Sequence, residues 1–235
     1  MAISYNPRIV TDGLVLALDA GNPKSYPGSG TTWTDLSGQG DNGTLVNGVG
    51  YDSANLGSLS FDGVNDYVDC GSNNILNFTN SFSVSFWMNN NISTNTLEYF
   101  VNRWTYSTGN YRQWSIDSGG VANRINFRIS GNGQDSGSTG IVSTNALYSS
   151  GWHHICGTWD GLIMILYVDG IIVAGPTSKT SMVSTPNQKT FIGGGNLGST
   201  LPMSGNIAQV SIYNKALTPQ EIQQNFNATR SRFSI

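Results

Sequence analysis

The chain has 235 residues, only 11% of them charged, and a formal net charge of −3 at pH 7. Apolar residues make up 38% and aromatic residues 11%, which is enough for a folded core and excludes a disordered chain. The Lys and Arg residues form no basic run, which excludes nucleic-acid binding, and the longest apolar run, Leu162 to Val168, is too short to insert into a membrane.

Short apolar stretches recur along the chain, each bounded by Gly, Asp, Asn or Ser. Alternation of apolar and polar residues within such stretches predicts half-buried strands. This many strands with turn residues between them predict an all-β fold, an antiparallel sandwich or jelly roll. The predicted strands are Leu14–Leu18, Ser58–Asp62, Asp66–Asp69, Phe82–Met88, Tyr99–Trp104, Tyr111–Ile116, Arg124–Ile129, Trp152–Trp159, Leu162–Val168, Ile171–Ala174, Thr190–Ile192 and Ile207–Tyr213.

The stretch GWHHICGTWDGLIMILYVDG, residues 151–170, holds both histidines of the chain. Side chains alternate between faces along a strand, so His153 and His154 point to opposite faces and cannot bind one metal together. Asp160-Gly161 and Asp169-Gly170 are hairpin turn signals. The two cysteines lie far apart without metal-like spacing, and we expect them to be buried free thiols.

One helix is predicted near the C-terminus, at Leu217–Phe226. Thr218 is placed as the N-cap, a proline follows it, and Glu221 completes a capping box. Ile222 and the phenylalanine four residues later share a face, which we expect to pack on the sandwich.

These motifs resemble the laminin-G-like domains of the concanavalin A-like lectin/glucanase superfamily. The matching segments are SLSFDGVNDYVDCG, FSVSFWMN, GWHHICGTWDG with LYVDGIIVA, and FIGGGNLGSTLPMSGNIAQVSIYNKALTPQEI. The resemblance covers about Gly13 to Asn227 and implies a two-sheet jelly roll whose first and last strands are neighbours. The chain would then divide into an N-terminal arm (1–12), the jelly-roll domain (13–229) and a C-terminal tail (230–235).

The two ends of the chain also resemble stretches of tailed-bacteriophage virion proteins. These are IVTDGLVLALDAGNPKSYPGSGTTWTDLSG and KALTPQEIQQNFNATRSRF. The resemblance implies a structural protein of the virion surface, either a capsid decoration or a fibre component. The N-terminal apolar run does not fit a signal peptide, because Asp12 precedes it and Pro7 interrupts the segment before it. We therefore expect synthesis in the host cytoplasm.

The expected partners are other virion proteins, sister copies of the chain and cell-surface glycans. One of the two terminal segments is expected to make the docking contact, so that deletion of residues 1–10 abolishes assembly but leaves melting unchanged. The alternative function is a soluble glycan-binding lectin module.

The carboxylate pattern argues against an enzyme. A retaining glycosidase needs two carboxylates about 5 Å apart, which on a strand requires acidic residues at positions i and i+2. The only glutamates are Glu98 and Glu221, and no two acidic residues are two positions apart. A GxSxG nucleophile elbow is also missing. The sequence therefore predicts a protein that is not an enzyme.

Calcium is the one cofactor considered, because many laminin-G-like domains bind it. Calcium takes about six to eight oxygen ligands, and the best local source is FDGVNDYVD, with Asp62, Asn65 and Asp66. The alternative is a tight turn between strands, for which these residues are ordinary. Related sequences often carry an acidic pair in the closing strand, where this chain has Ile207-Ala-Gln-Val.

Sugar recognition requires exposed aromatic side chains with polar neighbours. The segment 98–128 and the loop GSGTTWTDLSG offer such residues. The alternative is that the tryptophans of the segment are core residues and that the loop tryptophan covers one sandwich edge. The candidate ligand-binding residues are Trp33, Tyr99, Arg103, Trp104, Tyr106, Tyr111 and Arg112.

Overall fold

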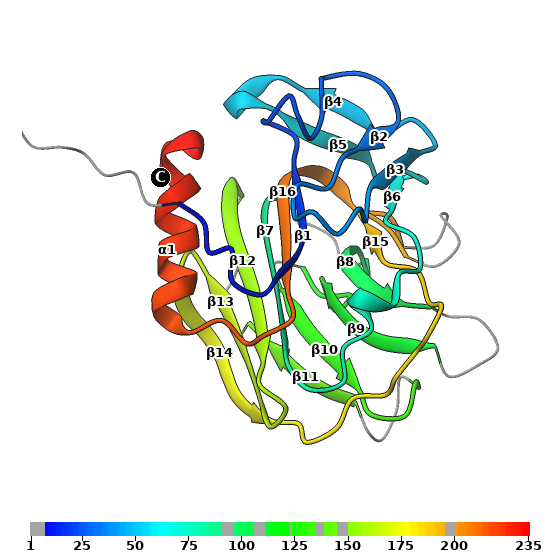
Figure 1. Ribbon diagram of the computed structural model, residues 1–235, viewed down its shortest axis with the longest axis vertical. Helices are drawn as coiled ribbons and strands as arrows, with labels where there is room; N and C mark the ends of the chain where they lie inside the picture. The colour runs from blue at the N-terminus through cyan, green and yellow to red at the C-terminus, as the bar shows by residue number, and fades with distance from the viewer. Residues whose placement is uncertain are drawn as a thin grey trace, which may run out of the picture.

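The structure is a computed structural model that describes residues 8–90, 96–105, 111–122, 124–134, 139–144, 150–195 and 201–235. Two antiparallel sheets pack face to face, and one α-helix lies outside them (Figure 1). The predicted all-β jelly-roll class with a single C-terminal helix is confirmed.

Sheet A brings the two ends of the chain together. Its strand order is β14-β13-β12-β7-β16-β5-β4, and β1 pairs with β16 beside this path. Leu18 lies opposite Val210, so the first and last strands are neighbours, as the family resemblance implies. The strands are β1 (Leu14–Asp19), β4 (Gly50–Asp52), β5 (Ser58–Asp62), β7 (Phe82–Asn90), β12 (Trp152–Trp159), β13 (Ile163–Val168), β14 (Ile171–Ser178) and β16 (Ser204–Tyr213).

Sheet B has the order β11-β10-β9-β8-β15-β6-β3-β2. Its strands are β2 (Thr32–Trp33), β3 (Gly43–Val46), β6 (Tyr67–Asp69), β8 (Tyr99–Trp104), β9 (Arg112–Asp117), β10 (Asn126–Ser130), β11 (Thr139–Ser143) and β15 (Phe191–Ile192). The sequence did not predict β2, β3, β4 or β11, because these strands are short or rich in Gly, Ser and Thr and carry no alternating pattern.

The main core lies between the sheets and is rich in aromatic side chains. The ring of Phe82 on β7 lies 5.6 Å from that of Trp114 on β9 and 5.8 Å from that of Phe127 on β10. A Cβ at Gly157 on β12 would stand 3.0 Å from the Phe127 ring, so glycine there allows the sheets to approach closely. The result is a packed scaffold on which the connecting segments are displayed.

Residues 151–170 form a hairpin of sheet A, and their predicted alternation is confirmed. Ile155 belongs to the core between the sheets, whereas His154 and Cys156 face the other side, where the helix packs. His153 instead bonds to Asp169 at the β13–β14 turn. Both cysteines of the chain are free and buried, and burial raises the pKa of each thiol well above its usual range.

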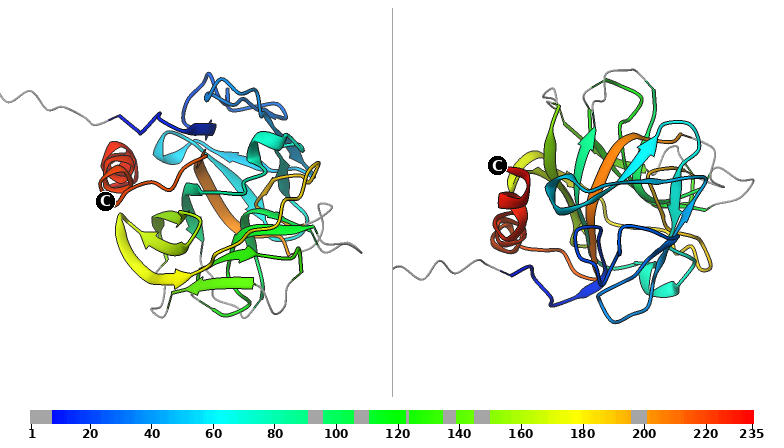
Figure 2. Two further views of the ribbon diagram at one scale, coloured as in Figure 1. Left: turned by 60° about the horizontal axis from the view of Figure 1, so that its bottom comes forward. Right: turned by 90° about the horizontal axis from the view of Figure 1, so that it is seen from above.

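The helix α1 (Pro219–Thr229) begins with the predicted capping box. The Thr218 N–H donates to Glu221 Oε2 at 2.9 Å, and the Glu221 N–H donates to Thr218 Oγ1 at 3.3 Å. Ile222 and Phe226 are buried, so α1 covers the outer face of sheet A (Figure 2). No described helix is long and apolar enough to span a membrane.

Three 3₁₀ helices complete the described structure: η1 (Ala54–Leu56), η2 (Asn74–Leu76) and η4 (Arg230–Phe233). The last of these is the segment that the sequence suggests is a C-terminal tail. Phe233 is buried, and its ring lies 4.2 Å from that of Trp87 and 4.6 Å from that of Trp152. Residues 230–233 therefore pack against sheet A and cover part of its outer face.

The N-terminal segment is held against α1 from residue 8 onward. The Val10 N–H donates to Asn225 Oδ1 at 2.7 Å, and the Tyr213 hydroxyl donates to the Val10 carbonyl at 3.0 Å. The Arg8 carbonyl accepts from Gln224 at 2.7 Å. Part of the expected N-terminal arm is thus integrated into the domain.

Deletion of residues 1–10 is expected to lower the free energy of unfolding by about 1 to 3 kcal/mol, because the Tyr213 hydroxyl loses its acceptor and Asn225 Oδ1 loses its donor, although Asn225 Nδ2 still donates to Tyr213. The sequence alone had indicated no effect on melting. Deletion of residues 1–7 is the matched control, since it keeps Arg8 and Val10. Urea unfolding compares the two proteins, and equal stability would contradict this expectation.

Candidate functional site

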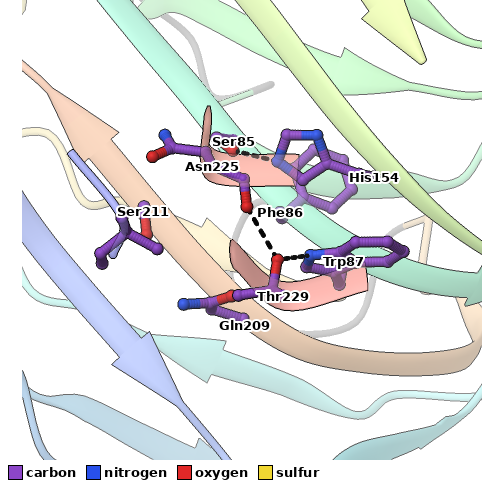
Figure 3. A pocket seen from close by; sticks show the side chains of 9 residues that line it. Ser85, Phe86, Trp87, His154, Gln209, Ser211, Asn225 and Thr229 are labelled. Carbon is purple, nitrogen blue, oxygen red and sulfur yellow. Dashed lines mark hydrogen bonds between the residues drawn. The ribbon is translucent and has the colours of Figure 1, made fainter. Parts of the chain in front are cut away.

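A polar layer lies between α1 and sheet A (Figure 3). Ser85 Oγ lies 2.7 Å from Nε2 of His154. The Trp87 indole N–H donates to Thr229 Oγ1 at 2.7 Å, and the Thr229 hydroxyl donates to the Asn225 carbonyl at 2.9 Å. The cavity among these side chains measures about 10 Å³, which is room for one water molecule at most. The layer is closed to any substrate.

The Ser85–His154 pair is not a hydrolase dyad with its orienting acid. The Asp169 carboxylate bonds to the backbone N–H of His154 at 2.8 Å and to Nδ1 of His153 at 2.7 Å, but not to the His154 ring. Burial lowers the pKa of His154 to about 4, although the charge of Asp169 opposes the shift. A sealed imidazole without a ring-bound carboxylate lacks the geometry of a catalytic base.

The structure corrects most of the predicted sugar-binding residues. Trp33, Tyr99, Arg103 and Trp104 are fully buried and cannot form an exposed platform. The Arg103 guanidinium points inward, where it donates to the Thr185 carbonyl at 3.1 Å, and burial lowers its pKa to about 10.

The structure does not contradict the other three candidates. Tyr111 is exposed and Arg112 is half-buried at the start of β9, so both stay predictions. Tyr106 lies outside the described residues.

The predicted calcium ligands form a turn between β5 and β6. Asp62 Oδ1 accepts from the N–H groups of Val64 at 2.8 Å and Asn65 at 3.4 Å, and Asp66 Oδ2 accepts from the Asp62 N–H at 3.2 Å. Burial raises the pKa of the Asp66 carboxyl. Within the described ranges, no three His, Cys, Asp or Glu side chains are grouped to hold a metal ion. These contacts support the alternative, a tight turn between strands. Calcium binding at Asp62, Asn65 and Asp66 stays a prediction.

An open cleft lies where the C-terminal end of the chain meets the connection between β4 and β5. Its volume is about 570 Å³, within the range of about 300–1,000 Å³ typical of ligand pockets. Its lining comes from segments far apart in the sequence, which no local pattern could bring together. The lining residues are Asp19, Gly21, Asn55, Leu56, Ala228, Thr229, Ser231 and Arg232.

Arg232 of η4 connects the segments that line this cleft through hydrogen bonds. Its Nη1 donates to Asp19 Oδ1 at 2.7 Å, its Nε donates to the Asn55 carbonyl at 2.5 Å, and its Nη2 donates to the Gly57 carbonyl. Hydrogen bonds from a guanidinium are strong and directional. The cleft is therefore held in shape by an ion pair and two backbone contacts. We call it the Arg232 cleft.

Residues 62–223 match the laminin-G-type family described as the concanavalin A-like lectin/glucanases superfamily. The chain belongs to this superfamily. No curated protein matches this concanavalin A-like chain.

Solved structures share the fold of this concanavalin A-like domain. The binding domain of Paraclostridial Mosquitocidal Protein 1 has a TM-score of 0.71 at 19% identity, covering 93% of this chain and 52% of that one. The binding domain of botulinum neurotoxin DC, in complex with rat synaptotagmin II, has a TM-score of 0.70 at 17% identity, covering 94% and 52%. The Trypanosoma rangeli sialidase, in complex with the inhibitor DANA, has a TM-score of 0.66 at 16% identity, covering 95% and 35%. The chain spans about half the length of the two binding domains, and identities this low show the fold alone.

Proposed function

We propose that this protein is a non-enzymatic structural protein of a bacteriophage virion surface, a capsid decoration or fibre component, which binds cell-surface glycans. The resemblance of its two ends to virion proteins supports the location. The sealed Ser85–His154 pair and the missing carboxylate pair support a role without catalysis. Among the similar structures are binding domains, one of them in complex with rat synaptotagmin II, and this chain shares their fold.

The observation that carries the structural role is the edge of sheet A at β14. Ile171 is 68% exposed and Ile172 51% exposed, and Val173 beside them is also exposed. No charged residue occurs from Ile171 to Ser178. Free edge strands normally carry charges or are very short, since an apolar edge invites another strand to pair with it. This edge is therefore suited to docking.

The occupant that best fits the edge is a second copy of the chain. Antiparallel pairing of residues 171–174 with the same segment of a sister copy sets Ile171 opposite Ala174 and Ile172 opposite Val173. Every cross-strand pair is then apolar, which stabilises an antiparallel pairing, and the contact is isologous. Each copy carries a net charge of −3, so an uncharged strand is a favourable place for two copies to meet.

Replacement of Ile172 by lysine is expected to convert self-associated protein to monomer and to lower its amount in purified virions. In this register the lysine would lie directly opposite Val173 of the sister copy at both symmetric positions, so each pairing would desolvate two charges against apolar side chains. Sedimentation velocity measures the assembly state, and mass spectrometry of gradient-purified particles measures incorporation. Val64→Lys, at an exposed position in the β5–β6 turn, is the control. Wild-type protein that is monomeric and absent from virions, or normal association of Ile172→Lys, would sink the proposal.

The soluble lectin module is the second candidate, and the open Arg232 cleft favours it. The two functions differ in where the protein is found. A lectin that is absent from purified particles but binds glycans would support the second function over the first.

A further inference from the structure

We infer that the Arg232 cleft binds a neutral saccharide, and that Leu56 is the apolar contact of this site. The inference rests on the glycan adhesion proposed above and assigns it to a place in the fold. It depends on three properties of the cleft: its charge balance, its mixture of polar and apolar groups, and the backbone conformation of residues 55–57 at its rim.

The charges of the cleft are paired within it. Arg232 directs its guanidinium to Asp19 and to two backbone carbonyls, so the one cation and the one carboxylate that line the cleft neutralise each other. An anionic ligand would have to compete with Asp19 for Arg232, and a cationic ligand would have to displace Arg232 from Asp19. An uncharged ligand requires neither exchange, which favours a neutral molecule.

The lining suits a ligand with hydroxyl groups on an apolar ring. Asp19, Asn55 and Ser231 bring carboxylate, amide and hydroxyl groups to the cleft. Ligand pockets combine a few such polar groups, which fix orientation, with apolar contact surface. Apolar surface comes from Leu56 of η1 and Ala228 of α1. A pyranose ring carries both kinds of surface.

The backbone at residues 55 and 56, which form the rim of the cleft, has an energetically costly conformation. Asn55 (φ 53°) and Leu56 (φ 68°) are both left-handed, and Leu56 is 71% exposed. Left-handed backbone costs free energy for any residue with a Cβ, most of all for one that cannot hydrogen-bond locally. An exposed leucine regains none of this cost by burial, so its side chain is placed for a contact with another molecule.

The rim is also rigid. A Cβ at Gly57 (φ 129°) would stand 2.6 Å from the Ala20 carbonyl oxygen, so the backbone after Leu56 is pressed against the end of β1. Its carbonyl is held by Arg232 as well. A preformed site loses little entropy when a ligand binds. The left-handed Leu56 is thus fixed at the mouth of the cleft before any ligand arrives.

Leu56→Gly tests the inference, because glycine accepts the left-handed backbone without strain and removes only the side chain. The purified protein is screened on immobilised neutral and sialylated oligosaccharides, and the affinity of a hit is measured by calorimetry. We expect a neutral oligosaccharide to bind, and Leu56→Gly to weaken that binding by about tenfold or more with a melting temperature equal to or above that of the wild type. Leu162→Gly, which removes an exposed leucine from the β12–β13 turn, should bind normally.

The outcomes separate this site from the proposed function. Equal binding by Leu56→Gly and the wild type would overturn the site while leaving glycan adhesion in place. Binding of sialylated oligosaccharides alone would overturn the neutral class. No binding to any oligosaccharide would overturn both the site and the glycan part of the proposed function, while the docking edge would still stand on the Ile172→Lys experiment.

Discussion

Replacement of Phe233 by alanine is expected to lower the free energy of unfolding by about 3 to 5 kcal/mol. The ring lies 4.2 Å from Trp87 and 4.6 Å from Trp152, and it closes the apolar cluster between α1 and sheet A. Truncation would leave a cavity between two indole rings and loosen η4, which carries Arg232. Urea unfolding measures the loss.

Ile235→Ala is the control, because Ile235 is exposed two residues further along the chain and surface truncations change stability by about 0.5 kcal/mol or less. Similar losses for the two variants would show that the C-terminal segment contributes little to the fold. The same pair of variants links the fold to the Arg232 cleft. If η4 forms one wall of the site, Phe233→Ala should also weaken ligand binding in protein that is still folded.

The packing of Phe233 could not be predicted from the sequence. Local patterns predicted β7, β12, β13 and α1, because alternation, hairpin dipeptides and a capping box are properties of consecutive residues. The last six residues, RSRFSI, have no such periodicity. Whether a lone phenylalanine packs depends on Trp87 and Trp152, which lie far away in the sequence, and no rule about neighbouring residues connects them.

Four of the seven predicted sugar-binding residues were wrong for a related reason. Alternation tells which side chains share a face of a strand, but not whether that face is covered. Trp33 and Trp104 were chosen for their residue type, yet large aromatic side chains gain most from burial, and the structure buries both. The cleft residues lacked any comparable signal, because Asp19, Leu56 and Arg232 become neighbours only when the first strand, a 3₁₀ turn and the C-terminal segment meet.

The histidine pair shows what the sequence could and could not resolve. Opposite faces for His153 and His154 followed from strand geometry alone, and this was enough to exclude a shared metal. The environment of His154 did not follow, because it depends on α1 packing over β7 and β12. His154 lies with its ring 5.4 Å from Trp87 and 6.0 Å from Phe226, and its Nδ1 is buried without a hydrogen-bond partner.

Because of this environment, we expect the free energy of unfolding to depend strongly on pH. Burial lowers the pKa of His154 from 6.5 to about 4, so below pH 6.5 the unfolded chain takes up a proton that the folded chain refuses. The stability that depends on neutral His154 is therefore complete above about pH 6.5, falls as the pH drops to about 4, and is constant below that. A shift of this size corresponds to a loss of about 3 kcal/mol across the window.

His154→Gln isolates this contribution, because glutamine can still bond to Ser85 and does not titrate. Burial raises the pKa of several carboxyls, including Asp117 and Glu98, and these groups favour the folded state as the pH falls. Their effect is common to both proteins and cancels in the difference. The wild type should lose about 3 kcal/mol relative to His154→Gln between pH 7 and pH 4 in urea unfolding. A difference that stays constant over this range would mean that His154 is protonated as easily in the folded protein as in the unfolded chain, and that α1 does not seal the polar layer beneath it.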